Sequence, residues 1–297
     1  MINSKTTDKI ATFFFYAVAC GTILLLTIFL GYILYNGRER LNLHFIFSEP
    51  TDMVAGGGIG PQLFNSVYLV ILSMIVTIPI GLSAGVYLAE YARKNAFTSA
   101  IRYCIETLAS LPSIVIGLFG YLAFVHLTGW GFTLLSGALA LSVLNLPVIT
   151  RISEDSIRNV PHSLKEASLA MGATHWQTIL KVIIPSALPG LLTGIIMTSG
   201  RVFGEAAALL YTAGMSNPPL DYTNFNPFSS NSPLNPMRGA ESLAVYIWKV
   251  NSEGLAPDAR QIADGASAIL VLFVFVFNIG SRFMGRVLSE KFTGKTK

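Results

Sequence analysis

Residues 107–150 read TLASLPSIVIGLFGYLAFVHLTGWGFTLLSGALALSVLNLPVIT, a run of 44 residues without Asp, Glu, Lys or Arg. A helix of about 20 residues crosses the hydrocarbon core of a bilayer, which is about 30 Å thick, so this run is long enough for two crossings. The glycines of Gly129-Trp130-Gly131 are typical of a turn between them. We therefore predict two membrane-spanning helices, at about 107–128 and 131–150.

The whole chain has the composition of a helical membrane protein. Its 297 residues are 52% hydrophobic and 12% charged, with a mean hydropathy of +0.58, whereas soluble domains carry roughly 25% charged residues. This composition excludes a soluble enzyme and a disordered chain, and the lack of apolar-polar alternation excludes an outer-membrane barrel. Further charge-poor stretches predict spans at about 10–35, 63–89, 182–211 and 265–284. The predicted fold is all-α, with six transmembrane helices in one domain, residues 1–297.

Lys and Arg are unequally divided between the two sides of the predicted spans. Fourteen of the 20 lie near the ends of the chain or in loops near 90–105 and 151–185, five lie in loops near 36–62 and 212–264, and Arg201 lies inside a span. Positive charge in excess marks the cytoplasmic side. We therefore predict cytoplasmic termini, a cytoplasmic loop at 151–185 and an extracytoplasmic loop at 212–264, irregular over 217–240 and helical over 240–250.

The cytoplasmic loop carries two helix-start patterns in succession. Ser163 is followed three residues later by Glu166, and Thr174 is followed by Gln177; both pairs fit a capping box. Gly172 between them favours a turn with positive φ. The loop is therefore predicted to form one short helix that ends near Met171 and a second that Pro185 ends.

The same loop resembles the EAA loop of ABC-importer permeases. The pattern of that family is E-A-A, three residues, G, nine residues, I, any residue, L, P. This sequence matches it in spacing with Glu166-Ala167-Ser168, Gly172, Val182 and Ile184-Pro185. In that family the loop inserts into a cleft of the ATPase subunit. The resemblance implies a type I ABC importer permease-like fold and an ATPase-coupling site at Glu166, Ala167, Ser168, Gly172 and Pro185. A generic amphipathic helix at the membrane surface is the alternative, although it needs no such glycine spacing.

The chain lacks a complete nucleotide-binding motif of its own. Gly294-Lys295-Thr296 has the ending of a phosphate-binding loop, but Ser289 stands where its first glycine is required. Cys20 and Cys104 have neither metal-ligand spacing nor the numbers of a disulfide framework. We expect no catalytic residue, metal or cofactor in this chain, and a transport subunit that depends on ATP used by a separate ATPase subunit.

Arg201 and Glu205 are charged residues inside the predicted span 182–211, four residues apart and so on one face of a helix. An arginine at mid-span costs about 2.5–3.5 kcal/mol, so it requires a partner or a water-filled path. The two residues can pair with each other, or they can line a substrate path. The guanidinium fork matches a tetrahedral oxyanion. Asn145, two residues before Pro147, is predicted to hydrogen-bond backbone groups that the proline leaves free.

The segment around this pair resembles the PstA family of phosphate-specific permeases. Its pattern, close to A-R-x-x-G-E-T-A-P-L-L-F-T-A, is matched at Arg201, Gly204, Glu205, Ala207, Leu209, Leu210, Thr212 and Ala213. The sequence departs from the pattern at Gly200, Ala206 and Ala208, where the family has Ala, Thr and Pro. The resemblance implies that Arg201 and Glu205 line the substrate path of an ATP-driven importer of inorganic phosphate.

The resemblance also implies a set of partners and a location. They are a homologous second permease subunit, two ATPase subunits and an extracytoplasmic phosphate-binding protein, in the cytoplasmic membrane of a prokaryote. Three alternatives remain open: an ABC permease for another oxyanion such as sulfate or molybdate, a proton-coupled secondary anion transporter, and a membrane scaffold in which Arg201 is structural. No nucleic acid partner is expected, because cytoplasmic Lys and Arg account for the net charge of +4.

Overall fold

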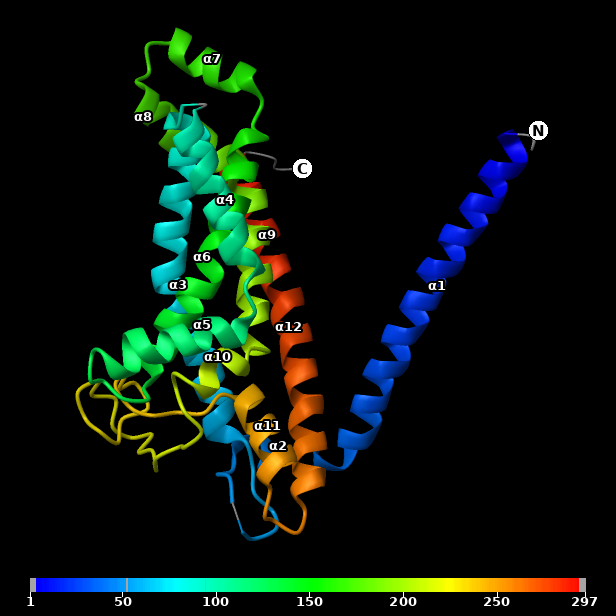
Figure 1. The fold of residues 1–297 in the computed structure, drawn as a ribbon, viewed down its shortest axis with the longest axis vertical. Helices are drawn as coiled ribbons and strands as arrows, with labels where there is room; N and C mark the ends of the chain where they lie inside the picture. The colour runs from blue at the N-terminus through cyan, green and yellow to red at the C-terminus, as the bar shows by residue number, and fades with distance from the viewer. Residues whose placement is uncertain (1–3, 52, 94, 294–297) are drawn as a thin grey trace.

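Five long helices dominate the computed structural model, which describes residues 4–51, 53–93 and 95–293 (Figure 1). They are α1 (Ser4–Gly37), α3 (Gly60–Val86), α6 (Leu134–Arg158), α9 (Ile184–Phe203) and α12 (Ala259–Thr293). Each lies in a helical segment long and apolar enough to cross a membrane, and a bent pair of helices makes up to six such segments. No β-strand occurs within the described ranges, so the predicted all-α class is confirmed. The Gly294-Lys295-Thr296 sequence lies outside the described residues.

Helices α3, α6, α9 and α12 pack into a bundle with a shared apolar core (Figure 1). Leu69 of α3 and Leu141 of α6 are buried there beside Phe203 of α9. The ring of Phe203 meets Phe273 and Phe277 of α12 edge-on, with ring centroids 5.1 and 5.0 Å away. Such aromatic contacts fix how α9 lies against α12.

Glycines bring α3 and α6 close together. A Cβ added at Gly81 would lie 2.6 Å from Cγ2 of Ile149, and one at Gly85 would overlap Cβ of Ser153. Small residues let two helices approach in a membrane, where van der Waals packing rather than water exclusion drives association. The α3–α6 pair is therefore tightly packed along the half of the bundle that carries the loop 151–185.

The stretch predicted as one span at 107–128 is instead a bent pair. Helix α4 (Ala96–Ser110) and the segment formed by α5 (Ser113–Gly120) and a π turn, η3 (Tyr121–His126), meet at 99°. Pro112 causes the break, because it lacks an N–H and holds Leu111 in an extended conformation with ψ 138°. The predicted turn after this segment is present, with φ 69° at Gly129 and 71° at Gly131.

The helix predicted at 182–211 has different limits. It begins with α8 (His175–Thr178), runs through the π turn η4 (Ile179–Ile183) and continues as α9 to Phe203. Pro185 therefore does not end a helix, contrary to the sequence-based expectation. It is the second residue of α9, and the π turn directly before it shifts the hydrogen-bond register where the proline has no N–H to donate.

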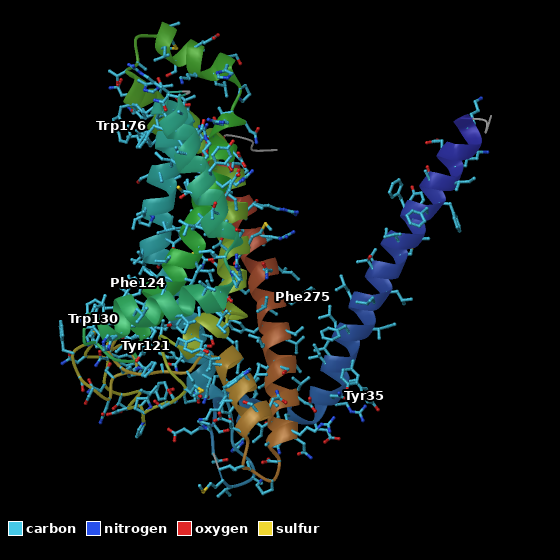
Figure 2. The ribbon with its side chains drawn as sticks, viewed as in Figure 1. Tyr35, Tyr121, Phe124, Trp130, Trp176 and Phe275 are labelled. Atoms are coloured by element: carbon cyan, nitrogen blue, oxygen red, sulfur yellow. The ribbon has the colours of Figure 1, made fainter. Side chains whose placement is uncertain are left out.

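Helix α1 diverges from the bundle along most of its length (Figure 1). Its apolar stretch is not buried by the rest of the chain, and it meets α12 near Gly37, which abuts Ala268 and Asp264. Figure 2 places Tyr35 near this end of α1 and Trp130 at the same end of the bundle, whereas Trp176 lies at the opposite end. Aromatic side chains at two levels are typical of the two borders of a membrane.

The predicted extracytoplasmic loop closes over the bundle end opposite α7 and α8. After the short helix α10 (Ala207–Leu210) the chain is irregular to residue 242, and the helix expected over 240–250 is present as α11 (Leu243–Glu253). Backbone hydrogen bonds from Leu134 N to Arg238 O and from Leu135 N to Pro236 O hold the loop on the start of α6. Two shorter elements, η1 (Arg38–Arg40) and α2 (Leu43–Phe47), complete this end.

Candidate functional site

The predicted loop 151–185 is shorter in the structure, because residues 151–158 are the last turns of α6 and residues 179–185 continue into α9. The part between them forms two short helices that project from one end of the bundle (Figure 1). Helix α7 (His162–Ala170) is followed by a turn at Gly172, where φ is 86°, and then by α8. The Thr174–Gln177 capping box is confirmed. The Ser163–Glu166 box is wrong: the N-cap of α7 is Pro161, two residues before Ser163, and it makes no side-chain cap hydrogen bond. Pro161 sets this start because its ring fixes the extended entry to the helix.

The predicted coupling residues lie on or beside these two helices. Glu166, Ala167 and Gly172 are exposed, whereas Ser168 is half-buried. The Ser168 hydroxyl lies 3.0 Å from the hydroxyl of Thr178 and so ties α7 to α8. Pro185 lies apart from this group, in the first turn of α9. The exposed face of α7 is thus available to a partner, and its inner face is fixed to the start of the transmembrane helix.

Glu90 joins the two coupling helices to the end of α3. It lies in the π turn η2 (Tyr87–Tyr91), and its carboxylate pairs with Lys165 of α7 and lies 3.1 Å from Nε2 of His175 in α8. The His175 ring also meets Tyr91 edge-on at 5.0 Å. Lys165 and His175 lie 75 and 85 residues from Glu90 in the sequence, so no local pattern indicates these contacts.

A second carboxylate closes α4 onto α6 at the same end. Glu154 is buried, accepts a hydrogen bond from Arg102 and forms an ion pair with Arg158, with an N–O distance of 2.9 Å to each. Glu106 and Arg151 form a further pair at 2.6 Å, but both side chains are about half exposed. The buried network is the stronger link, because solvent screens an exposed pair.

Arg201 and Glu205 do not share a helix face. Helix α9 ends at Phe203 with Gly204 as its C-cap, and Glu205 follows the break. The buried Glu205 carboxylate accepts a hydrogen bond from the backbone N–H of Ala208, at 3.2 Å, and so caps α10. Arg201 is exposed on the last turn of α9, and no ion pair joins it to Glu205 or to another residue whose side chain is described. The pairing of these two residues considered from the sequence is therefore absent in this part of the structure.

Asn145 is fully buried in α6, and neither its amide nitrogen nor its amide oxygen has a hydrogen-bond partner. The expected bond to backbone groups left free by Pro147 is not formed. An unsatisfied buried amide costs about 1–3 kcal/mol, so its retention in a helix core is unusual. Asn65 of α3 is the contrasting case, because its amide bonds Arg238, Asn217 and the backbone of Glu241.

Arg238 in the irregular loop was not singled out from the sequence. Its guanidinium is buried, donates to Oδ1 of Asn65 at 2.6 Å and to the carbonyl of Pro233 at 3.1 Å. Burial lowers the pKa of Arg238 to about 10. The sequence signal was a charged residue within a stretch of Asn, Pro and Ser, which alone does not distinguish a buried clamp from a solvated side chain.

Comparison with known proteins places the chain among membrane transport components. Residues 77–294 match the family described as "Binding-protein-dependent transport system inner membrane component". The chain is 54% identical over 98% of its length to a probable ABC transporter permease protein, YqgI, of Bacillus subtilis (strain 168), covering 99% of that protein. It is 32% identical to the phosphate transport system permease protein PstA of Pasteurella multocida (strain Pm70), with 83% of each chain covered.

Solved structures share its fold. An inward-facing structure of the MetNI methionine ABC transporter matches with a TM-score of 0.57 and 21% identity, over 75% of this chain and 93% of that one. A bacterial ABC transporter that imports the acidic polysaccharide alginate matches with a TM-score of 0.60 and 15% identity, over 96% and 99%. The fold is that of type I ABC importer permeases. With the family match covering most of its length, this chain belongs to the family of binding-protein-dependent transport system inner membrane components.

Proposed function

We propose that this chain is the permease subunit of an ATP-driven importer of inorganic phosphate in a prokaryotic cytoplasmic membrane. Permeases of this family work with a partner permease, ATPase subunits and a substrate-binding protein. The proposed set here is one homologous second permease, two ATPase subunits and an extracytoplasmic phosphate-binding protein. The termini, α7 and α8 face the cytoplasm in this proposal, because the Lys and Arg excess lies at that end.

Arg201 carries the choice of phosphate. It is an exposed guanidinium on a helix that crosses the membrane, and Glu205, which could neutralise it, caps α10 instead. The N–H groups of a planar, permanently charged guanidinium can donate hydrogen bonds to two oxygens of a tetrahedral anion. The similarity to PstA from Pasteurella multocida supports phosphate over other oxyanions.

The route from ATP hydrolysis to the path runs through the contacts around Glu90 and Ser168. The exposed face of α7 would dock on an ATPase subunit, and the Lys165–Glu90 and Ser168–Thr178 contacts would transmit its movement to α3 and to the helix that continues as α9. Because α9 also carries Arg201, a shift of this helix would change which side of the membrane reaches the guanidinium. ATP is bound by the partner subunit in this scheme, and not by this chain.

Uptake of labelled phosphate tests the substrate and Arg201 together. The chain would be expressed with its partner subunits in cells that lack their own high-affinity phosphate uptake, with unlabelled phosphate, sulfate or molybdate as competitor. Arg201→Gln should lower uptake by about tenfold or more, since a charge-assisted bond contributes about 1.5–3 kcal/mol. Arg260→Gln is the matched control, because Arg260 is an exposed arginine in the first turn of another long helix, α12.

Each outcome discriminates between the proposals. Competition by phosphate alone, with uptake lost in Arg201→Gln at normal expression, supports phosphate and the site. Competition by sulfate or molybdate keeps the ABC permease and overturns phosphate. Uptake in Arg201→Gln equal to that of Arg260→Gln would reduce Arg201 to a structural residue.

A further inference from the structure

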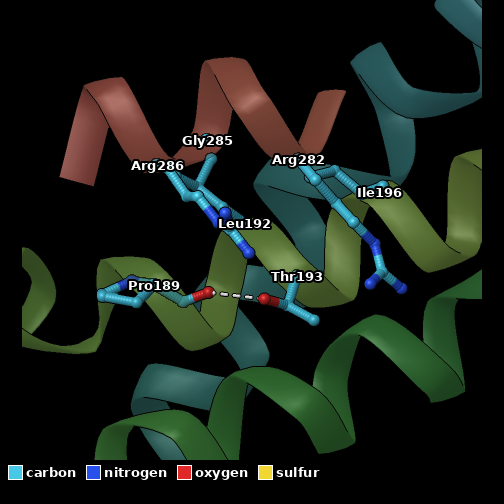
Figure 3. Close-up of a pocket in the computed structure, with 7 residues that line it drawn as sticks. All are labelled: Pro189, Leu192, Thr193, Ile196, Arg282, Gly285 and Arg286. Atoms are coloured by element: carbon cyan, nitrogen blue, oxygen red, sulfur yellow. Dashed lines mark hydrogen bonds between the residues drawn. The ribbon is translucent and has the colours of Figure 1, made fainter. Parts of the chain in front are cut away.

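A pocket of about 320 Å³ lies between α9 and α12, near the end of the bundle that carries α7 and α8. Figure 3 shows its walls: Leu192, Thr193 and Ile196 come from α9, and Arg282, Gly285 and Arg286 come from α12. A Cβ added at Gly285 would make ordinary contacts with Ile196 at 3.6 Å and Leu192 at 3.8 Å, so this position of α12 directly faces the apolar wall on α9. The pocket therefore combines an apolar wall with a basic one.

The two arginines are poised for an anion. They are four residues apart, so both lie on one face of α12, and Figure 3 shows both side chains extending toward α9. Both are exposed, and neither has an ion-pair partner among the residues whose side chains are described. Like charges at this spacing repel each other. An anion placed between them would relieve that repulsion.

The pocket lies at the border of the apolar zone. The charge-free run of α12 extends from Gly265 to Ser281, and Arg282 is the first charged residue after it. A charge at such a border lies at the level of the lipid headgroups. The basic wall is thus at the depth where the phosphate groups of phospholipids lie.

An exposed apolar stripe leads from the arginines into the membrane. Phe275 and Ile279 precede Arg282 and Arg286 at spacings of three and four residues, so all four share one face of α12. Phe275 is 63% exposed and Ile279 is 54% exposed, and Figure 2 shows Phe275 on the outside of the helix. This stripe would cover an acyl chain whose headgroup lies at the arginines.

We propose that this pocket binds the phosphate group of an anionic phospholipid. The two guanidinium groups hold the phosphate oxygens, and Leu192, Ile196 and the stripe contact the acyl chain. Free inorganic phosphate offers the same oxygens but no apolar part, and so makes no use of these walls. The inference does not depend on the transported solute, and it holds whether or not phosphate is the substrate.

Lipid retention by the assembled transporter tests the site. The complex with its partner subunits would be placed in bilayer discs of phosphatidylcholine containing labelled phosphatidylglycerol as a minor component. After extraction into detergent and gel filtration, the label retained per complex is measured. Each basic residue near an anionic surface strengthens binding about fivefold, so Arg282→Gln with Arg286→Gln should weaken retention about 25-fold. Arg260→Gln, at the other end of α12, should leave it unchanged.

Two further arms keep the test decisive. Gly285→Leu fills the pocket while both arginines remain, and it should also abolish retention in a complex that elutes normally. Excess inorganic phosphate should not displace the label. Displacement by phosphate would assign the pocket to the free anion and overturn the lipid site. Equal retention by wild type and the double variant would also overturn it. Neither result bears on the proposed substrate, which phosphate uptake tests separately.

Discussion

At the scale of single residues, two buried asparagines behave in opposite ways. Asn65 is bonded on both amide atoms, to Arg238, Asn217 and the backbone of Glu241. Asn145 is equally buried and has no partner on either atom. A helix core that tolerates such a loss is expected at a site that functions, because sequences break local rules where activity requires it.

Replacement of each asparagine by leucine separates stability from function. Asn145→Leu should leave thermal stability of the purified complex unchanged or raise it, because it removes an unsatisfied amide that costs about 1–3 kcal/mol. Asn65→Leu should destabilise by about 2–4 kcal/mol, because it removes one of the hydrogen-bond acceptors of the buried Arg238 guanidinium. If Asn145 functions in transport, its variant loses uptake without losing stability. A clear fall in the unfolding temperature of Asn145→Leu would contradict this account of the residue.

At the scale of elements, Glu90 is the point where three segments meet. The π turn that ends α3, helix α7 and helix α8 are joined through its carboxylate to Lys165 and His175. The side chain of Glu90 is 9% exposed, whereas Glu106, which pairs with Arg151 on α6, is 50% exposed. A buried acceptor shared by two donors contributes more than an exposed pair of the same chemistry.

Glu90→Gln should weaken the link of α7 and α8 to the end of α3, whereas Glu106→Gln should leave that link unchanged. Removing the charge weakens the bonds to Lys165 and His175 by about 1.5–3 kcal/mol in total, but it keeps an acceptor and the side-chain volume. We expect ATP hydrolysis by the assembled complex to continue while uptake per ATP falls several-fold. The control, Glu106→Gln, should change the ratio of phosphate uptake to ATP hydrolysis by less than about twofold. Identical ratios in both variants would remove Glu90 from the coupling route.

At the scale of the whole molecule, features with local causes were predictable and features that join distant segments were not. The Thr174–Gln177 capping box is determined by four neighbouring residues, and it is present as predicted. The lengths of the charge-free stretches predicted the long helices but not the bend at Pro112. The absence of charged residues does not indicate where a proline interrupts the hydrogen bonding of a helix. The Glu90–Lys165 pair joins positions 75 residues apart, so it follows from packing, which no local pattern encodes.

The native cysteines allow a test of the proposed orientation. Cys104 is exposed on α4, two residues after Arg102, which pairs with Glu154 at the end of the bundle that carries α7 and α8. Cys20 is exposed within the apolar length of α1. A membrane-impermeant maleimide should therefore label the chain in inverted vesicles and not in intact cells, because thiols react as thiolates in water. Labelling should be lost in Cys104→Ser. Labelling of Cys104 from the outside of intact cells would reverse the orientation.

The break after Phe203 has an electrostatic consequence for Arg201. This residue lies in the last turn of α9, where the helix macrodipole places about half a negative elementary charge. The dipole favours the guanidinium by about 0.3–1 kcal/mol and partly offsets its attraction for an anion, which corresponds to roughly twofold to fivefold shorter residence. Arg201 therefore attracts an anion but binds it weakly enough for fast release, which suits transport better than tight binding does.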